Sequence, residues 1–162
     1  MIVHVFGAAK DGATMQAAFQ RYSADDEWQR RMSAYMQQTS ADLTNEILLP
    51  VAGRALSEPA MIRSWRVARA RQDKFAEALT LATKLVEHVN ASHADAALSL
   101  YVQDVGDFGT LHWIEDYGGI AHWAELKSRL LRDPAFLALQ DELNALLVEG
   151  SIQTEMLENY AL

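Results

Sequence analysis

The sequence predicts an α+β fold built from three βαβ units, with antiparallel sheets and helices on one face. Segments of alternating polarity flank three long segments of helical periodicity. In addition, residues 3–49 recur in degenerate form as residues 111–157, so that His4 aligns with His112 at an offset of 108 residues. One βαβ unit cannot bury its own apolar face, and a repeat of this kind therefore indicates units that stack on one another.

Six strands are expected from alternation and from β-branched or aromatic content. They are Ile2–Phe6, Glu46–Val51, Ile62–Arg69, Ala96–Gln103, Thr110–Glu115 and Ile152–Leu157. A short segment with two glycines, residues 105–109, joins the fourth and fifth strands and predicts a hairpin.

Three helical segments separate these strands. The middle one carries an apolar stripe at helical spacing: Phe75, Leu79, Ala82, Val86 and Val89. The third begins near Ile120 and contains Asp133-Pro134, an N-cap followed by proline at the first helical position, which predicts a restart. The first helix has a similar restart signal at residues 23–26.

The element order places a linker near residues 53–59 and divides the chain in two. Residues 1–56 form an N-terminal βαβ half-repeat, and residues 57–162 spell βαββαβ, the ferredoxin-like order. A closed two-sheet barrel uses four βαβ units, but this chain has three, so one sheet face needs a cover. We therefore expect a homodimer.

The amino-acid composition excludes several classes of partner and of active site. The chain has 162 residues, 50% hydrophobic and 22% charged, with a net charge of −8. The negative charge argues against nucleic acid or an anionic membrane as the main partner. The chain has no cysteine, which excludes disulfides, thiolate metal sites and a cysteine nucleophile.

No targeting segment or membrane span is expected. The N-terminal apolar stretch is short and lacks a basic region, and no stretch approaches the roughly 20 apolar residues that a membrane helix needs. The expected location is cytoplasmic.

Several segments resemble NIPSNAP-like proteins. Residues 62–67 (IRSWRV) resemble the opening strand of that family, and Gly106 with residues 111–117 (LHWIEDY) resembles its glycine hairpin and histidine–aromatic strand. Residues 132–136 (RDPAF) and 46–50 (EILLP) are similar to its helix restart and closing strand. The family's usual Pro-Gly after the first strand is Arg69-Ala70 here, and the N-terminal copy lacks an opening βαβ unit.

This resemblance implies the dimeric α/β-barrel type of ferredoxin-like fold. That group includes cofactor-independent monooxygenases, polyketide cyclases, isomerases, decarboxylases and haem-binding enzymes, and also members with no known activity. It implies no particular reaction, because one fold hosts many functions.

His112 is the first candidate for a catalytic residue, with Tyr101 beside it. His112 lies mid-strand, and a histidine that titrates near neutrality inside a barrel could act as general base towards a phenol or an enol. The alternative is a buried structural histidine that bonds to a carbonyl or a tyrosine. Its repeat counterpart, His4, has no assigned role.

The expected substrate pocket consists of Ser99, Gln103, Trp65 and Arg66. In the strand 96–103, the leucine and valine row faces the helices, so Ser99, Tyr101 and Gln103 face into a barrel or a subunit contact. Trp65 stacks on a flat ligand or packs in a core.

Two arginines lie on opposite faces of one strand, so either Arg63 or Arg66 points inward. An inward arginine needs a carboxylate, from Glu115, Glu155 or Glu158 or from an anionic substrate, and an internal ion pair is the preferred interpretation.

No metal site and no cofactor are expected. His88 and His93 are five residues apart across a helix end, where they would not share a face. Three functions stay open: a cofactor-independent monooxygenase or cyclase acting on an aromatic or polyketide-like substrate, a non-enzymatic NIPSNAP-like binding module, and a haem protein using His122 or His88. A cavity of roughly 300 Å³ lined by His112 and Tyr101 would favour the first.

Overall fold

The computed structural model describes residues 12–38, 47–54, 60–105 and 109–158. The chain divides into two compact units, residues 1–44 and 45–162. The first unit contains helices α1 (Gly12–Ala24) and α2 (Asp26–Gln38). The backbone N–H of Trp28 donates to Asp25 Oδ1 at 3.0 Å, which confirms the predicted helix restart. The predicted strand Ile2–Phe6, with His4, lies outside the described residues.

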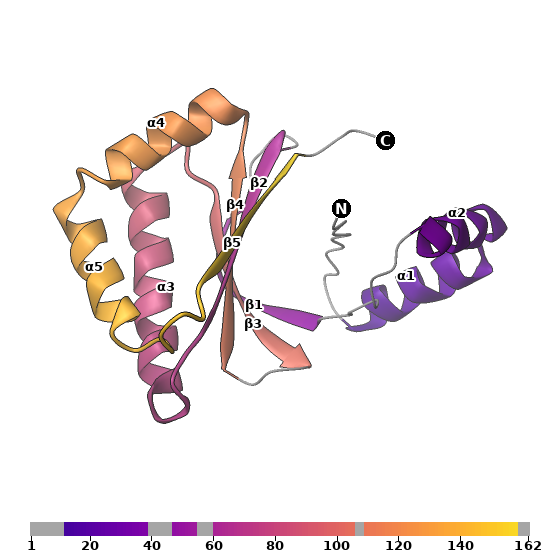
Figure 1. Ribbon diagram of the computed structural model, residues 1–162, viewed down its shortest axis with the longest axis horizontal. Coiled ribbons are helices and arrows are strands. Elements are labelled where there is room, and N and C mark those ends of the chain that lie inside the picture. The colour runs from indigo at the N-terminus through magenta and orange to yellow at the C-terminus, as the bar shows by residue number, and fades with distance from the viewer. Residues whose placement is uncertain (1–11, 39–46, 55–59, 106–108, 159–162) are drawn as a thin grey trace. The chain divides into compact units, whose positions relative to one another are not determined.

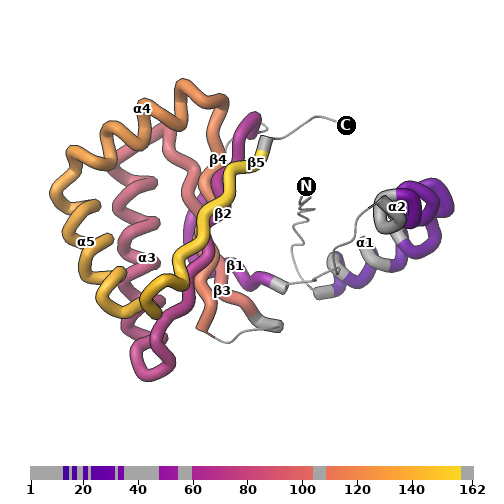
Figure 2. The backbone as a smooth tube through the Cα atoms, viewed as in Figure 1, coloured from indigo at the N-terminus to yellow at the C-terminus, as the bar shows by residue number. Residues whose placement is uncertain are grey.

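The second unit contains one antiparallel sheet in the order β1-β3-β4-β2-β5. Its strands are β1 (Ile47–Gly53), β2 (Ile62–Arg69), β3 (Leu98–Val105), β4 (Thr110–Tyr117) and β5 (Gln153–Glu158). Strands β2 to β5 with their helices form the predicted ferredoxin-like βαββαβ order, and β1 extends the sheet by pairing with β3. Figure 2 shows β5 running beside β2, as their pairing requires.

Helices α3 (Phe75–Ser92), α4 (Ile120–Leu130) and α5 (Pro134–Asn144) lie on one face of this sheet (Figure 1). A single 3₁₀ turn, η1 (Gln72–Lys74), precedes α3. The α3 stripe packs as predicted, since Ala82, Val86 and Val89 are buried. No helix in the described ranges is long and apolar enough to span a membrane.

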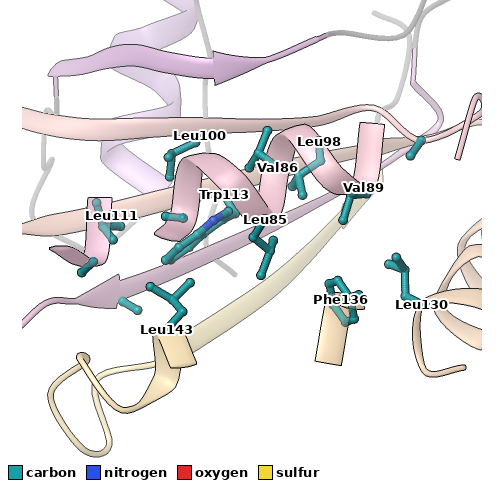
Figure 3. Packing of buried hydrophobic residues seen from close by; sticks show 14 of the residues in the cluster. Leu85, Val86, Val89, Leu98, Leu100, Leu111, Trp113, Leu130, Phe136 and Leu143 are labelled. Carbon is teal, nitrogen blue, oxygen red and sulfur yellow. The ribbon is translucent and has the colours of Figure 1, made fainter. Parts of the chain in front are cut away.

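Strand alternation gives the sheet two different faces. The helix-facing side carries Leu100 of β3 and Leu111 and Trp113 of β4, which pack against α3 and α5 (Figure 3). We call the other side the opposite face; it carries Trp65 of β2, Tyr101 of β3 and His112 of β4. Each residue of a strand therefore belongs to one of two separate environments.

Asp133 links α5 to α3. Its Oδ1 accepts from the backbone N–H groups of Ala135 and Phe136 at 2.9 and 3.1 Å, as expected of an N-cap. Its Oδ2 lies 2.7 Å from His88 Nε2 on α3. The hydrogen bond from His88 and those from the two backbone groups lower the pKa of Asp133, because all of them favour the charged carboxylate.

Asp133→Ala is expected to lower the free energy of unfolding by about 1–2 kcal/mol, because both the cap and the link to His88 are lost. Asp133→Asn, whose side chain still caps, is the control. Urea denaturation at pH 7 measures both variants. Since the pKa of Asp133 is lowered in the folded state, its contribution is present at neutral pH and is lost as the pH falls through that pKa. Equal stability of the alanine variant and the wild type would contradict this role.

Candidate functional site

Five of the six predicted site residues share one face of the sheet, and the sixth lies on the other face. Four of them share the opposite face with Trp65: Ser99, Tyr101, Gln103 and His112. Arg66, the next residue after Trp65, lies on the helix-facing side. Consecutive strand residues point to opposite faces, so one pocket in this sheet cannot contain both Trp65 and Arg66.

His112 is held by Trp65. The indole Nε1–H of Trp65 donates to His112 Nδ1 at 3.1 Å, and the ring planes are 19° apart. Because an indole can only donate, Nδ1 is the acceptor, and in the neutral ring the proton is on Nε2. Nε2 is buried and has no hydrogen-bond partner within the described ranges.

This geometry differs from the general base that the sequence suggested. His112 is 1% exposed, and burial lowers its pKa to about 4, so the ring is neutral at pH 7. The lone pair that a base would use is occupied by the Trp65 N–H. In this arrangement His112 can donate a hydrogen bond from Nε2, but it has no free acceptor nitrogen.

Arg63, also on the opposite face, pairs with Asp116. Its Nε and one terminal nitrogen donate to the two carboxylate oxygens at 2.7 and 3.0 Å, and this hydrogen-bonded pair raises the pKa of Arg63. An internal ion pair was expected for an inward arginine, but Asp116 was not among the acids considered. The partner depends on the register between β2 and β4, which sets Arg63 directly across from Asp116.

A cavity of about 200 Å³ lies on the helix-facing side, between strands β2, β4 and β5 and helices α3 and α5. Neither His112 nor Tyr101 lines it. Its apolar lining consists of Ala68, Leu85, Leu98, Trp113, Leu130, Phe136, Leu143, Leu147 and Ile152. Its polar lining consists of Arg66, Glu115, Gln140, Asn144 and Thr154. Figure 3 shows the indole of Trp113 between the sheet and α3, with Leu143 of α5 nearby.

Glu115 is the acid of this cavity, and it already has partners. Lys127 Nζ and the Tyr117 hydroxyl both donate to Glu115 Oε2. Burial alone would raise the pKa of Glu115, but the charge and hydrogen bond of Lys127, with help from Tyr117, lower it. Burial and the neighbouring Glu115 raise the pKa of Tyr117. At pH 7 the trio is therefore an ionised carboxylate, an ammonium and a neutral phenol.

Arg66 and Trp113 differ from Glu115, because each has a hydrogen-bond donor without a partner among the described residues. Arg66 is half-buried and forms no hydrogen bond and no ion pair within 4 Å with any residue that the structure describes; Glu115 acts on it only at longer range. The indole Nε1–H of Trp113 is buried and also lacks a partner in this part of the chain. Of these two residues the sequence singled out Arg66 for the pocket. The sequence signal that could have identified Trp113 is its place two residues before Glu115, on the same face of β4.

His88 and His93, which were not expected to share a face, both approach Asp133. The Nε2 atoms of His88 and His93 lie 2.7 and 3.7 Å from Asp133 Oδ2, because the start of α5 approaches the end of α3. His122 Nε2 lies 3.3 Å from Asp95. No group of three or more histidine or acidic side chains in the described ranges is arranged to hold a metal ion.

Several solved structures resemble this chain. A NIPSNAP family protein from Agrobacterium tumefaciens matches with a TM-score of 0.54 and 21% identity, over 67% of this chain and 95% of its own. A NIPSNAP domain protein from Burkholderia xenovorans matches with a TM-score of 0.53 and 22% identity, over 62% and 96%. The chain has the fold of these two NIPSNAP proteins. The predicted resemblance is thus confirmed at the level of fold.

Monooxygenase-type structures share this fold. A Fusobacterium nucleatum protein assigned provisionally as a monooxygenase matches with a TM-score of 0.62 and 11% identity, over 88% of this chain and 63% of its own. No protein-family model and no curated protein matches the chain. At these identities the likeness establishes the ferredoxin-like α+β fold, and it does not assign a function, because one fold hosts many functions.

Proposed function

We propose that this protein binds a small molecule in the cavity between the sheet and helices α3 and α5. The observation that carries the proposal is the combination of an apolar lining with two unused donors, Arg66 and the Trp113 indole. Small-molecule sites are typically concave and mostly apolar, with a few convergent polar groups that orient the ligand. The opposite face offers a buried His112 donor, but no described residue of that face lines this cavity.

The reaction we propose is that of a cofactor-independent monooxygenase or cyclase acting on an aromatic or polyketide-like substrate. The monooxygenase-type neighbours support this class. In such a reaction Arg66 and the Trp113 N–H would stabilise negative charge on a substrate oxygen, as preorganised donors do at developing oxyanions.

One observation favours a second candidate, a binding module without chemistry. Among the residues that line the cavity, Glu115 is the one acid, and it is held by Lys127 and Tyr117. A cavity without a free base binds a ligand more readily than it removes a proton.

Ala68→Leu tests the cavity directly. Ala68 is fully buried on β2 and lines the cavity, so a larger side chain is expected to fill part of it and to weaken ligand binding by about tenfold or more. Val67→Leu, the neighbouring residue on the opposite face, is the matched control. Monooxygenase activity is measured as oxygen uptake with phenolic and enolic substrates, without flavin and with a chelator present.

The outcomes separate the two candidates. Oxygen uptake by the wild type and by Val67→Leu, but not by Ala68→Leu, would support the enzyme. Ligand binding that Ala68→Leu abolishes, without turnover of any substrate, would support the binding module. Binding that is the same in all three proteins would rule out the cavity as the site.

We also propose that a second copy of the chain covers the opposite face. Trp65 and Tyr101 are only half-buried there, and the buried Nε2–H of His112 lacks an acceptor in the described ranges. Sedimentation equilibrium at micromolar concentration is expected to show a dimer, and Val67→Glu, which adds a charge to this face, is expected to shift it to monomer. A wild-type monomer would contradict the proposal.

A further inference from the structure

The geometry points to a small monocarboxylate with an apolar or aromatic body as the ligand of this cavity, with its carboxylate on Arg66. This inference rests on the proposed function, since it names the chemical class that the same cavity takes.

The charges of the side chains around Arg66 and Glu115 do not balance without a ligand. Arg66 is positive, and Glu115 is the negative residue nearest to it among the lining side chains. Glu115 is already ion-paired with Lys127, so its charge is offset before Arg66 is counted. The three side chains together carry one net positive charge. A partly buried cation without a counterion is costly, and a ligand carboxylate removes that cost.

The hydrogen-bonding groups agree with the charge. A guanidinium has five donors and no acceptor, and its fork matches the two oxygens of a carboxylate. The Trp113 indole N–H adds a further donor on the same side of β4 as Glu115. Two amides, Gln140 and Asn144, supply adaptable groups from α5. The unused groups are mainly donors, so the ligand head must be rich in acceptors.

The size and lining of the cavity define the rest of the ligand. An apolar cavity of about 150 Å³ holds a benzene molecule. The cavity of this protein, at about 200 Å³, has room for a ring or a short alkyl chain and a carboxylate. The wall formed by Leu85, Phe136 and Leu143 suits such a body. A phosphate ester or a sugar would leave this apolar wall unfilled.

The test compares a carboxylate with its neutral isostere on the wild-type protein. Calorimetric titrations with benzoate and with benzamide use the full chain at pH 7 and low salt. Benzoate is expected to bind at least about tenfold more tightly than benzamide, because a hydrogen bond to a charged group contributes more than one to a neutral group. Hexanoate against hexanamide repeats the comparison without a ring.

Variants assign the preference to Arg66. Arg66→Met is expected to lose about tenfold or more in benzoate affinity and to leave benzamide affinity within about twofold, and Arg66→Lys is expected to recover part of the loss. Arg69→Met is the matched control, since Arg69 is an exposed residue of the same strand that does not line the cavity. Arg69→Met should bind benzoate as the wild type does.

Three results would overturn the inference. If benzamide binds the wild type as tightly as benzoate, the preference for a carboxylate is excluded, but the cavity remains a small-molecule site. Benzoate binding that Ala68→Leu does not weaken would place the anion elsewhere. If no carboxylate binds while phenols or enols are still converted and Ala68→Leu blocks that conversion, this inference fails and the proposed function stands. The wild-type comparison needs no variant, so a poorly folded Arg66→Met leaves the test intact.

Discussion

Lys127→Met is expected to lower the free energy of unfolding by about 3 kcal/mol at pH 7, because it removes the cation that compensates Glu115. Glu115 is largely buried, and its negative charge is stabilised by the Lys127 ammonium and the Tyr117 hydroxyl. Without the ammonium, burial dominates, and the pKa of Glu115 should rise instead of being lowered. Urea denaturation at pH 5 and at pH 8 measures the effect.

The pH dependence has a definite sign. A carboxyl whose folded pKa is raised contributes stability below its unfolded pKa and loses it as the pH rises. The deficit of Lys127→Met relative to the wild type should therefore be larger at pH 8 than at pH 5. The double variant Glu115→Gln, Lys127→Met removes both charges and should recover most of the loss. If Lys127→Met alone is as stable as the wild type at pH 8, the stabilising role of the Glu115–Lys127 ion pair is contradicted.

The second large effect concerns His112. Its pKa is about 4 in the folded protein, against about 6.5 in an unfolded chain. Between these values the unfolded chain binds more protons, so stability falls as the pH drops from 6.5 towards 4. The loss that His112 causes is expected to reach up to about 3 kcal/mol near pH 4.

His112→Gln is the matched variant for this prediction. The glutamine amide can still accept from the Trp65 N–H and donate in the other direction, but it does not titrate. Denaturation curves at pH 7 and pH 4.5 should show a smaller acid loss for the variant than for the wild type. The same acid loss in both proteins would mean that His112 is not the buried neutral group described above.

Local sequence patterns predicted most of the fold. The alternation in residues 62–69 gave the bounds of β2 without error, and Asp133-Pro134 gave the break between α4 and α5. Both signals are local, because a strand period and a helix cap each involve a few neighbouring residues. The expected βαββαβ order followed from these elements and is confirmed by the strand order.

The candidate site was predicted less well, for a physical reason. Strand alternation separates Trp65 from Arg66, but it does not say which face of the sheet encloses a cavity. That depends on how α5 packs, since Gln140 and Asn144 of α5 line the same cavity as Arg66 of β2, and this long-range arrangement has no local signal. The link from Asp133 to His88 and the pair of Arg63 with Asp116 are also set by packing and strand register.

The location of the ligand decides between the two faces of the sheet, and indole N–H resonances report it residue by residue. The chain has four tryptophans, so ¹⁵N-labelled protein gives four such signals. On titration with benzoate, the Nε1–H signal of Trp113 should shift, because Trp113 lines the cavity, whereas that of Trp65 on the opposite face should stay. A shift of Trp65 with Trp113 unmoved would place the ligand beside His112 and contradict the cavity as the binding site.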